Sequence, residues 1–325
     1  MSYPPQDVEL FAPDGAFYGV VRPLPPRPSA GRWLVHGALF LLTVASTTVV
    51  GGMQFATPSW QRPGGAWERW STWELLWRTV SDPAVLGGGL AFALPLMAIL
   101  LAHEMGHYLA CRHHRLDATL PFFLPVPFGI GTLGAFIRIR SPLASKRELV
   151  DVGASGPLSG FAVALPVLYF GILHSQVVHE LPRGSYLVFG EPLLFKVMAA
   201  WIHPELRAGA DLLLHPTGYA AWIGLLVTAL NLLPFGQLDG GHIAYAALGR
   251  LHRFLAWPLL FVLVGLGFFW TGWWVWAVVA LVMGVKHPWI PGELEPLPEE
   301  RRWVAAAAFL VFALCFTPEP VKIVP

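Results

Sequence analysis

Long apolar runs constrain this 325-residue chain more than any other feature. The runs that we expect to form membrane helices cover residues 33–53, 87–113, 155–173, 218–235, 255–270, 273–286 and 303–317. Hydrophobic residues make up 55% of the chain and charged residues only 13%. In soluble domains about 45–50% of the residues are hydrophobic and about 25% are charged. A soluble surface needs charge and a lipid-facing surface excludes it, so the sequence predicts an integral membrane protein.

The runs predict an all-α polytopic fold with about six to eight membrane segments. The count is open because a short apolar piece at 241–249 could dip into the membrane and return. The proline-rich residues 1–32 form a leader, residues 33–317 a single membrane domain, and residues 318–325 a tail. We therefore expect one integral membrane domain.

Lysine and arginine predict how this domain is oriented. Roughly two thirds of the 21 basic residues lie in the leader and in 112–154, 250–253 and 286–302. Basic residues concentrate on the cytoplasmic side, so these segments and the N-terminus are expected there. We favour a bacterial plasma membrane, with an organelle membrane as the alternative.

The net charge of +1 gives no sign of a nucleic-acid partner, and the two cysteines offer neither a disulfide framework nor a cysteine zinc site.

One apolar run carries three ionisable side chains, His103, Glu104 and His107, in the pattern H-E-x-x-H. Residues four apart share a helix face, so both imidazoles can bind one ion while Glu104 takes a proton from water. His103 lies nine residues before the basic residue Arg112, which puts it about 14 Å below the cytoplasmic surface. The alternative is two helix histidines with structural hydrogen bonds, but ionisable groups in lipid are candidates for function.

A catalytic zinc ion usually has three protein ligands. Asp239 is the expected third, since it follows an apolar run in a stretch rich in glycine and proline. His242 is the competing ligand or a neighbour that orients the Asp239 carboxylate. Asn231 could hold the substrate or stabilise a developing oxyanion. The alternatives are a turn-forming role for Asp239 and a capping or interhelical hydrogen bond for Asn231.

Taken together, "HEMGH" (103–107) and "NLLPFGQLDGG" (231–241) resemble the site-2 protease family of intramembrane zinc metalloproteases. "DVGASGPLSG" (151–160) resembles the Gly-Pro segment that opens this family's intervening span. The resemblance implies a three-helix core, here 87–113, 155–173 and 218–235. Many relatives carry a PDZ or a regulatory nucleotide-binding domain, but the stretch 112–154 is too short for one and the tail ends soon after the last run. We therefore expect a compact member without these domains.

By this resemblance His103, His107 and Asp239 bind one Zn²⁺ ion, Glu104 activates water, and Asn231 assists at the substrate. The implied function is hydrolysis of peptide bonds in transmembrane or membrane-anchored proteins, as in regulated intramembrane proteolysis. The alternatives are a non-cleaving membrane scaffold or chaperone that keeps the metal site and, less favoured, an ion-conducting transporter. The partners are membrane-protein substrates and the lipid bilayer, while the sequence leaves the substrates, the trigger and the oligomeric state open.

A small re-entrant β-element is expected in "GIGTLGAFIRIRSP" (129–142), where apolar and other residues alternate from Phe136 to Arg140. Beside the metal, its edge could pair with an extended substrate, with Gly131, Gly134 and Phe136 as binding residues. The family resemblance also points to such an element. The alternative is a surface hairpin whose arginines meet lipid phosphates. The sequence assigns no role to 54–83 or 174–217.

Overall fold

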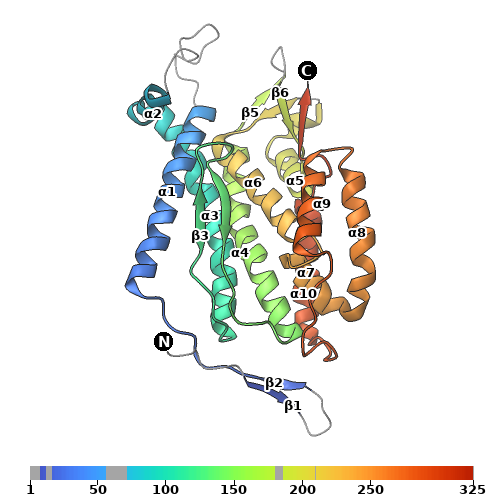
Figure 1. Ribbon diagram of the computed structural model, residues 1–325. Coiled ribbons are helices and arrows are strands. Elements are labelled where there is room, and N and C mark those ends of the chain that lie inside the picture. Colours follow the sequence, from blue (N-terminus) through green and yellow to red (C-terminus); the bar gives the residue numbers. More distant parts are fainter. Residues whose placement is uncertain (1–7, 12–16, 56–71, 180–185, 209, 325) are drawn as a thin grey trace.

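The computed structural model describes residues 8–11, 17–55, 72–179, 186–208 and 210–324 (Figure 1). Its helices are α1 (Ala30–Phe55), α2 (Thr72–Ser81), α3 (Pro83–His113), α4 (Lys146–Leu173), α5 (Leu193–Ile202), η3 (Pro204–Ala208), α6 (Pro216–Asn231), α7 (Asp239–Leu248), η4 (Gly249–Leu251), α8 (His252–Leu266), α9 (Gly272–Met283) and α10 (Glu299–Cys315). Its strands are β1 (Val8–Phe11), β2 (Phe17–Val21), β3 (Phe122–Pro125), β4 (Thr132–Phe136), β5 (Gln176–Val178), β6 (Tyr186–Phe189), β7 (Asp211–Leu213) and β8 (Val321–Val324). Parts of the segments without an assigned role, 56–71 and 180–185, lie outside the described residues.

Within the described residues, 4 helical stretches are long and apolar enough to cross a membrane. They are α1, α3, α4 and Asp239–Leu266, in which the single turn η4 separates α7 from α8. This confirms a mostly helical membrane protein, but the finding is four such stretches rather than the expected six to eight. The run at 218–235 forms a helix of only 16 residues, because a proline at 234 cannot continue it.

Helices α3 and α4 form the centre of the molecule, and α1 and α6 pack against them. Helix α3 begins at Pro83, where the Asp82 carboxylate accepts the Ala84 N–H at 2.9 Å. Helix α4 begins at Lys146, nine residues before the expected start at 155, because its first turns are polar and do not register as an apolar run. It is continuous through Pro157, so the Gly-Pro segment lies inside the helix rather than at its start.

Strands β3 and β4 form an antiparallel hairpin that runs along α1. After β4 the expected alternation is confirmed: Ile137 and Ile139 pack on a buried cluster, while Phe136, Arg138 and Arg140 are exposed. The small β-element therefore exists at the predicted place in the sequence. Its depth in the membrane stays a prediction.

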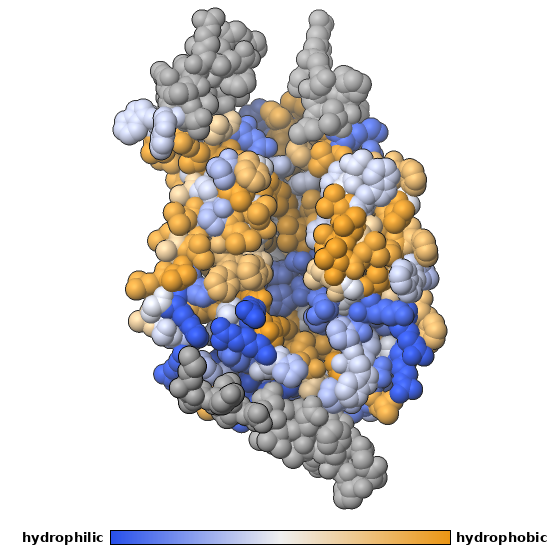
Figure 2. Space-filling model, in the orientation of Figure 1, coloured by the Kyte–Doolittle hydropathy of each residue, from blue (hydrophilic) through white to orange (hydrophobic). Residues whose placement is uncertain are grey.

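The surface of the molecule divides into an apolar part and a hydrophilic end. Figure 2 shows apolar side chains over α1 and over α8 and α9, with a hydrophilic band near the end that carries the N-terminus. A furrow separates the two apolar areas, and hydrophilic residues lie at its floor. This distribution agrees with a protein that exposes its middle to lipid.

Helix α1 packs closely on α3, and this packing leads to a prediction about two glycines of α3. A Cβ atom at Gly89 would clash with the backbone carbonyl of Thr48, whereas a Cβ atom at Gly87 would meet nothing within 4 Å. We expect Gly89→Ala to reduce stability by about 1–3 kcal/mol through overpacking. Gly87→Ala should leave stability unchanged or raise it by up to about 1 kcal/mol. Unfolding of both variants in detergent tests this, and equal stabilities would contradict the packing.

Candidate metal centre

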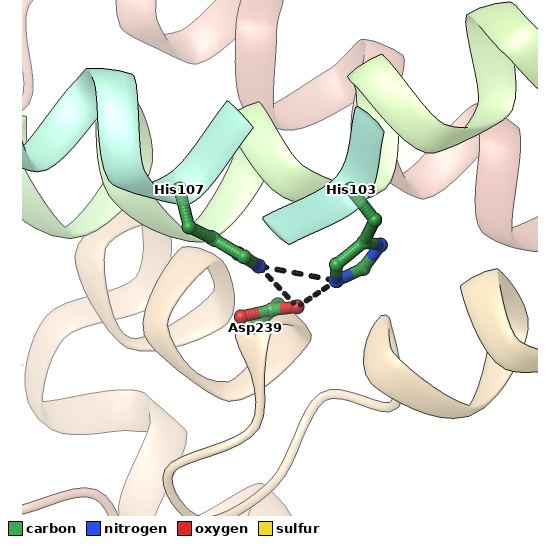
Figure 3. A group of neighbouring side chains, drawn as sticks. All are labelled: His103, His107 and Asp239. Carbon is green, nitrogen blue, oxygen red and sulfur yellow. Dashed lines mark hydrogen bonds and ion pairs between the residues drawn. The ribbon is translucent and has the colours of Figure 1, made fainter. Parts of the chain in front are cut away.

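Helix α3 places His103 and His107 side by side, one turn apart on the same face (Figure 3). Both side chains are buried, and their Nε2 atoms are 3.1 Å apart. Two imidazole nitrogens at this distance can bind one metal ion. The predicted pair is therefore brought together by the helical spacing of four residues.

Asp239 reaches the same point from the first turn of α7. Its Oδ2 atom lies 3.5 Å from His103 Nε2 and 3.2 Å from His107 Nε2. The residue belongs to the helix rather than to the preceding loop, which turns at Gly236 with a positive φ of 59°. That turn is anchored by the N–H of Gly236, which donates to the Val285 carbonyl at 2.9 Å. This anchored turn precedes the helix that carries Asp239.

The three side chains form a donor set that fits a metal ion. Their candidate ligand atoms all lie within 4.8 Å of one another, and in the described part of the chain no other group of three such residues does so. Two imidazoles and one carboxylate are ligands that zinc accepts, and a three-residue set leaves positions open for substrate and water. The residues therefore fit Zn²⁺.

The orientation of the His107 ring is set by α4. His107 Nδ1 lies 2.8 Å from the Val152 carbonyl oxygen, which can only accept a hydrogen bond. The Nδ1 atom therefore carries the proton, and the lone pair of Nε2 is available for a metal. Gly156 lies beneath the ring, and a Cβ atom there would clash with it. No role for Val152 or Gly156 was predicted; the glycines of "DVGASGPLSG" are the sequence feature that could have indicated this close packing.

Glu104 is buried beside the two histidines, with 7% of its surface exposed. It lies on α3 between the two predicted metal ligands His103 and His107. The predicted base is therefore inside the protein and next to the metal-binding side chains.

Asn231 is the last residue of α6, and its side-chain Nδ2 lies 3.3 Å from His103 Nε2. The amide is therefore at the centre, next to a metal-binding atom. His242 follows one turn after Asp239, and its Nδ1 lies 2.7 Å from His287 Nε2. A role for His242 in orienting the Asp239 carboxylate stays a prediction.

The three predicted substrate-binding residues differ in their surroundings. Gly131 is buried against α1, where its carbonyl accepts a hydrogen bond from Ser46 Oγ at 2.7 Å. Gly134 borders open space, with nothing within 4 Å of a Cβ atom placed there. Phe136 is 46% exposed. The accessible part of the element thus consists of Gly134 and Phe136, whereas Gly131 holds the hairpin on α1.

The contact between Gly156 and His107 gives a testable prediction. We expect Gly156→Ala to displace the His107 ring and to weaken zinc binding by about 10–100-fold, the usual effect of disturbing a group that orients a ligand. Competition with a chromogenic chelator measures the zinc Kd. Gly87→Ala, on the open side of α3, is the control. A wild-type Kd for Gly156→Ala would show that α4 does not hold the ring.

The model of Peptidase family M50 matches residues 91–258, just over half of the chain. Probable zinc metalloprotease EGY1, chloroplastic, of Oryza sativa subsp. japonica is 35% identical over 184 residues, which are 55% of this chain and 31% of that protein. Probable zinc metalloprotease EGY2, chloroplastic, of Arabidopsis thaliana is 33% identical over 177 residues, 51% of this chain and 30% of that protein.

The matched region spans less than a third of each of these relatives. No solved structure matches the chain. Both relatives are named as zinc metalloproteases, in agreement with the predicted enzyme class and with Zn²⁺ as its metal. Both are also named as chloroplastic, so they lend no support to a bacterial plasma membrane. Since the family match covers more than half of the chain and includes both the H-E-x-x-H motif and Asp239, the chain belongs to Peptidase family M50.

Proposed function

We propose that this protein is a zinc-dependent endopeptidase that cleaves transmembrane or membrane-anchored proteins within or near the bilayer. The observation that carries the proposal is a group of four ionisable side chains. Two histidines and a buried glutamate lie on α3, a helix apolar enough to span a membrane, and the aspartate reaches them from α7. Such groups are unfavourable in lipid unless they serve a function. The family assignment supports the reaction class.

In this proposal His103, His107 and Asp239 hold the zinc ion. Zinc bound there would supply Lewis-acid activation of the peptide carbonyl and of water. Glu104 takes the proton from the attacking water and later gives it to the leaving amine. The burial of Glu104 beside the two histidines supports this role. Asn231 donates a hydrogen bond to the substrate carbonyl, which its position beside His103 supports.

The substrate binds as an extended segment rather than as a helix. A helical carbonyl is already hydrogen-bonded, so the scissile region must unwind and find new backbone partners. The free edge of β4 offers them by strand addition. Exposed Phe136 contacts a substrate side chain, and Gly134 leaves room for the incoming backbone. The segment after β4 packs on a buried cluster that includes Cys111 of α3, the helix of the two histidines, which supports this location.

The single membrane domain spans residues 33–317, with the leader and the active-site side facing the cytoplasm or the equivalent compartment of an organelle. The distribution of basic residues supports this orientation. Water reaches the centre from that side, past the turn between α6 and α7. The protein would then act in regulated intramembrane proteolysis, releasing parts of its substrates from the membrane.

Replacement of the proposed base separates cleavage from metal binding. We expect Glu104→Gln to reduce cleavage of a membrane reporter by about 10²–10⁴-fold, the usual contribution of general-base catalysis. Zinc content should stay near one ion per chain, whereas Asp239→Ala should lose the ion. Metal analysis of the purified protein and a reporter assay in vesicles measure both. Wild-type cleavage by Glu104→Gln would overturn the assignment, and absence of cleavage by the wild type on any membrane reporter would favour a scaffold.

Truncation of the exposed aromatic ring on β4 tests the substrate edge. We expect Phe136→Ala to lower kcat/KM by about tenfold, which corresponds to about 1.4 kcal/mol of lost contact. Zinc content should not change, because the ring binds no metal. Phe128→Ala is the control, since that residue is 63% exposed at the far turn of the same hairpin. Equal effects of the two substitutions would indicate a general effect on the hairpin rather than a substrate contact.

A further inference from the structure

A groove between α3, α4 and α10 lies apart from the metal centre. Its volume is about 460 Å³, within the range of about 300–1,000 Å³ that is usual for ligand pockets. Its lining residues come from the last turns of α3, the first half of α4 and the start of α10. Neither the three metal ligands nor Glu104 is among them. The groove is therefore a second concave surface with a chemistry of its own.

The polarity of the groove changes along its length. His114, Asp151 and Arg301 line one end, directly after α3 and near the starts of α4 and α10. These helix ends lie at the hydrophilic end of the molecule (Figure 2). Further along, the wall is apolar and includes Leu109 and Leu158. From Asp151 to Leu158 is seven residues, about 10 Å along a helix. The groove thus has a polar mouth and an apolar interior.

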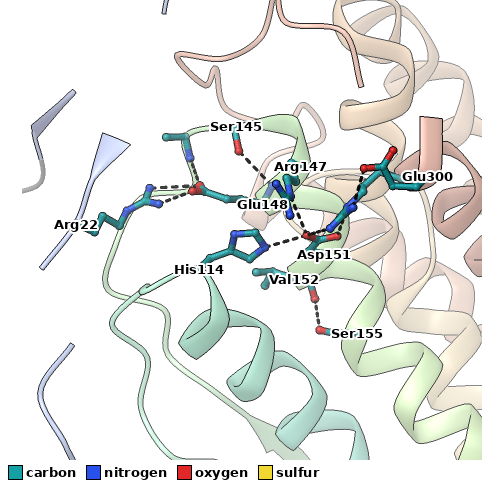
Figure 4. A network of polar contacts seen from close by, with 11 residues as sticks. Arg22, His114, Ser145, Arg147, Glu148, Asp151, Val152, Ser155 and Glu300 are labelled. Carbon is teal, nitrogen blue, oxygen red and sulfur yellow. Dashed lines mark hydrogen bonds and ion pairs between the residues drawn. The ribbon is translucent and has the colours of Figure 1, made fainter. Parts of the chain in front are cut away.

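Basic side chains surround the one carboxylate that lines the mouth (Figure 4). His114 Nε2 lies 2.9 Å from Asp151 Oδ2, and Arg301 donates to the same carboxylate from Nε at 3.0 Å and Nη2 at 3.2 Å. Arg147 lies beside them, with its Nε 3.7 Å from Asp151 Oδ2 and its side chain 52% exposed. Glu300 contacts Arg301 Nη1, but its side chain is 65% exposed to the surroundings. The charge of Asp151 is therefore compensated, and Arg147 keeps N–H groups directed at the surface.

We propose that this groove binds an anionic phospholipid, with the phosphate at Arg147 and His113 and one acyl chain along Leu109 and Leu158. Both parts of the groove match such a molecule. Arginine and imidazole N–H groups bind phosphate oxygens, and the apolar wall removes a hydrocarbon chain from polar surroundings. Basic pockets between membrane helices are typical sites for anionic headgroups. A small polar anion alone would leave the apolar part of the groove without a partner.

Native mass spectrometry of the whole chain in detergent, titrated with dioleoyl phosphatidylglycerol, tests the mouth. We expect one site with an affinity at least about fivefold higher than for dioleoyl phosphatidylcholine, whose choline adds a cation beside the arginines. Arg147→Gln should weaken binding of the anionic lipid about fivefold, the effect of one surface arginine. Arg253→Gln is the matched control, since this arginine is exposed at the start of α8, away from the groove.

The apolar wall is tested with two leucines of α3. Leu109 lines the groove and is 59% exposed, whereas Leu94 is 54% exposed and lies outside it. We expect Leu109→Ala to weaken binding of the anionic lipid about fourfold, the effect of losing roughly one buried methylene contact. Leu94→Ala should bind as the wild type does. Equal effects of the two substitutions would indicate lipid that merely surrounds the protein, and would overturn the inference.

The remaining outcomes are equally decisive. Wild-type affinity in Arg147→Gln or in Leu109→Ala, or equal affinities for the two lipids, would overturn the inference. Both substituted side chains are more than half exposed, so the variants should fold. Inorganic phosphate that displaces the lipid at equal concentration would identify a site for a free anion instead. None of these measurements needs proteolysis, so Glu104→Gln protein should bind lipid as the wild type does, and a failure of the proposed function would leave the lipid site intact.

Discussion

The contact between α3 and α4 is the constraint on which the metal centre depends. His107 can present Nε2 to a metal only while its Nδ1 proton is bound by the Val152 carbonyl. That hydrogen bond forms because Gly156 leaves space for the ring between the two helices. The backbone of α4 thus selects the tautomer of a residue on α3. The chemistry of the site is fixed by how closely two membrane helices approach each other, and small residues make that approach possible.

The second constraint is that each polar group of the centre needs a partner in apolar surroundings. The partners come from separate parts of the chain: His107 is bound by the Val152 carbonyl of α4, His103 lies beside Asn231 of α6, and Asp239 of α7 contacts both imidazoles. An unpartnered polar group here would be strongly unfavourable. The four helices therefore stabilise one another through the site.

Local patterns in the sequence predicted the parts of this arrangement that local physics determines. The spacing of four residues placed His103 and His107 together, and an alternation with period two predicted the faces of the segment after β4. Helix bounds were less predictable, because α4 begins with a polar turn that hydropathy does not register. The location of Gly131 against α1 and the hydrogen bond between His107 and Val152 depend on tertiary packing, which leaves no local pattern.

The ion pair of Arg22 and Glu148, which are 126 residues apart, illustrates the same limit. Residues 91–258, which match the family model, include Glu148, Pro142 and the whole metal centre, whereas Arg22 lies outside them. A buried carboxylate inside the matched region thus has its cationic partner outside it. Since an unpaired buried charge would be strongly unfavourable, the matched region of this chain does not carry all the partners of its own buried groups. Arg22 of the leader is for this reason a structural partner of α4, the same helix that orients His107.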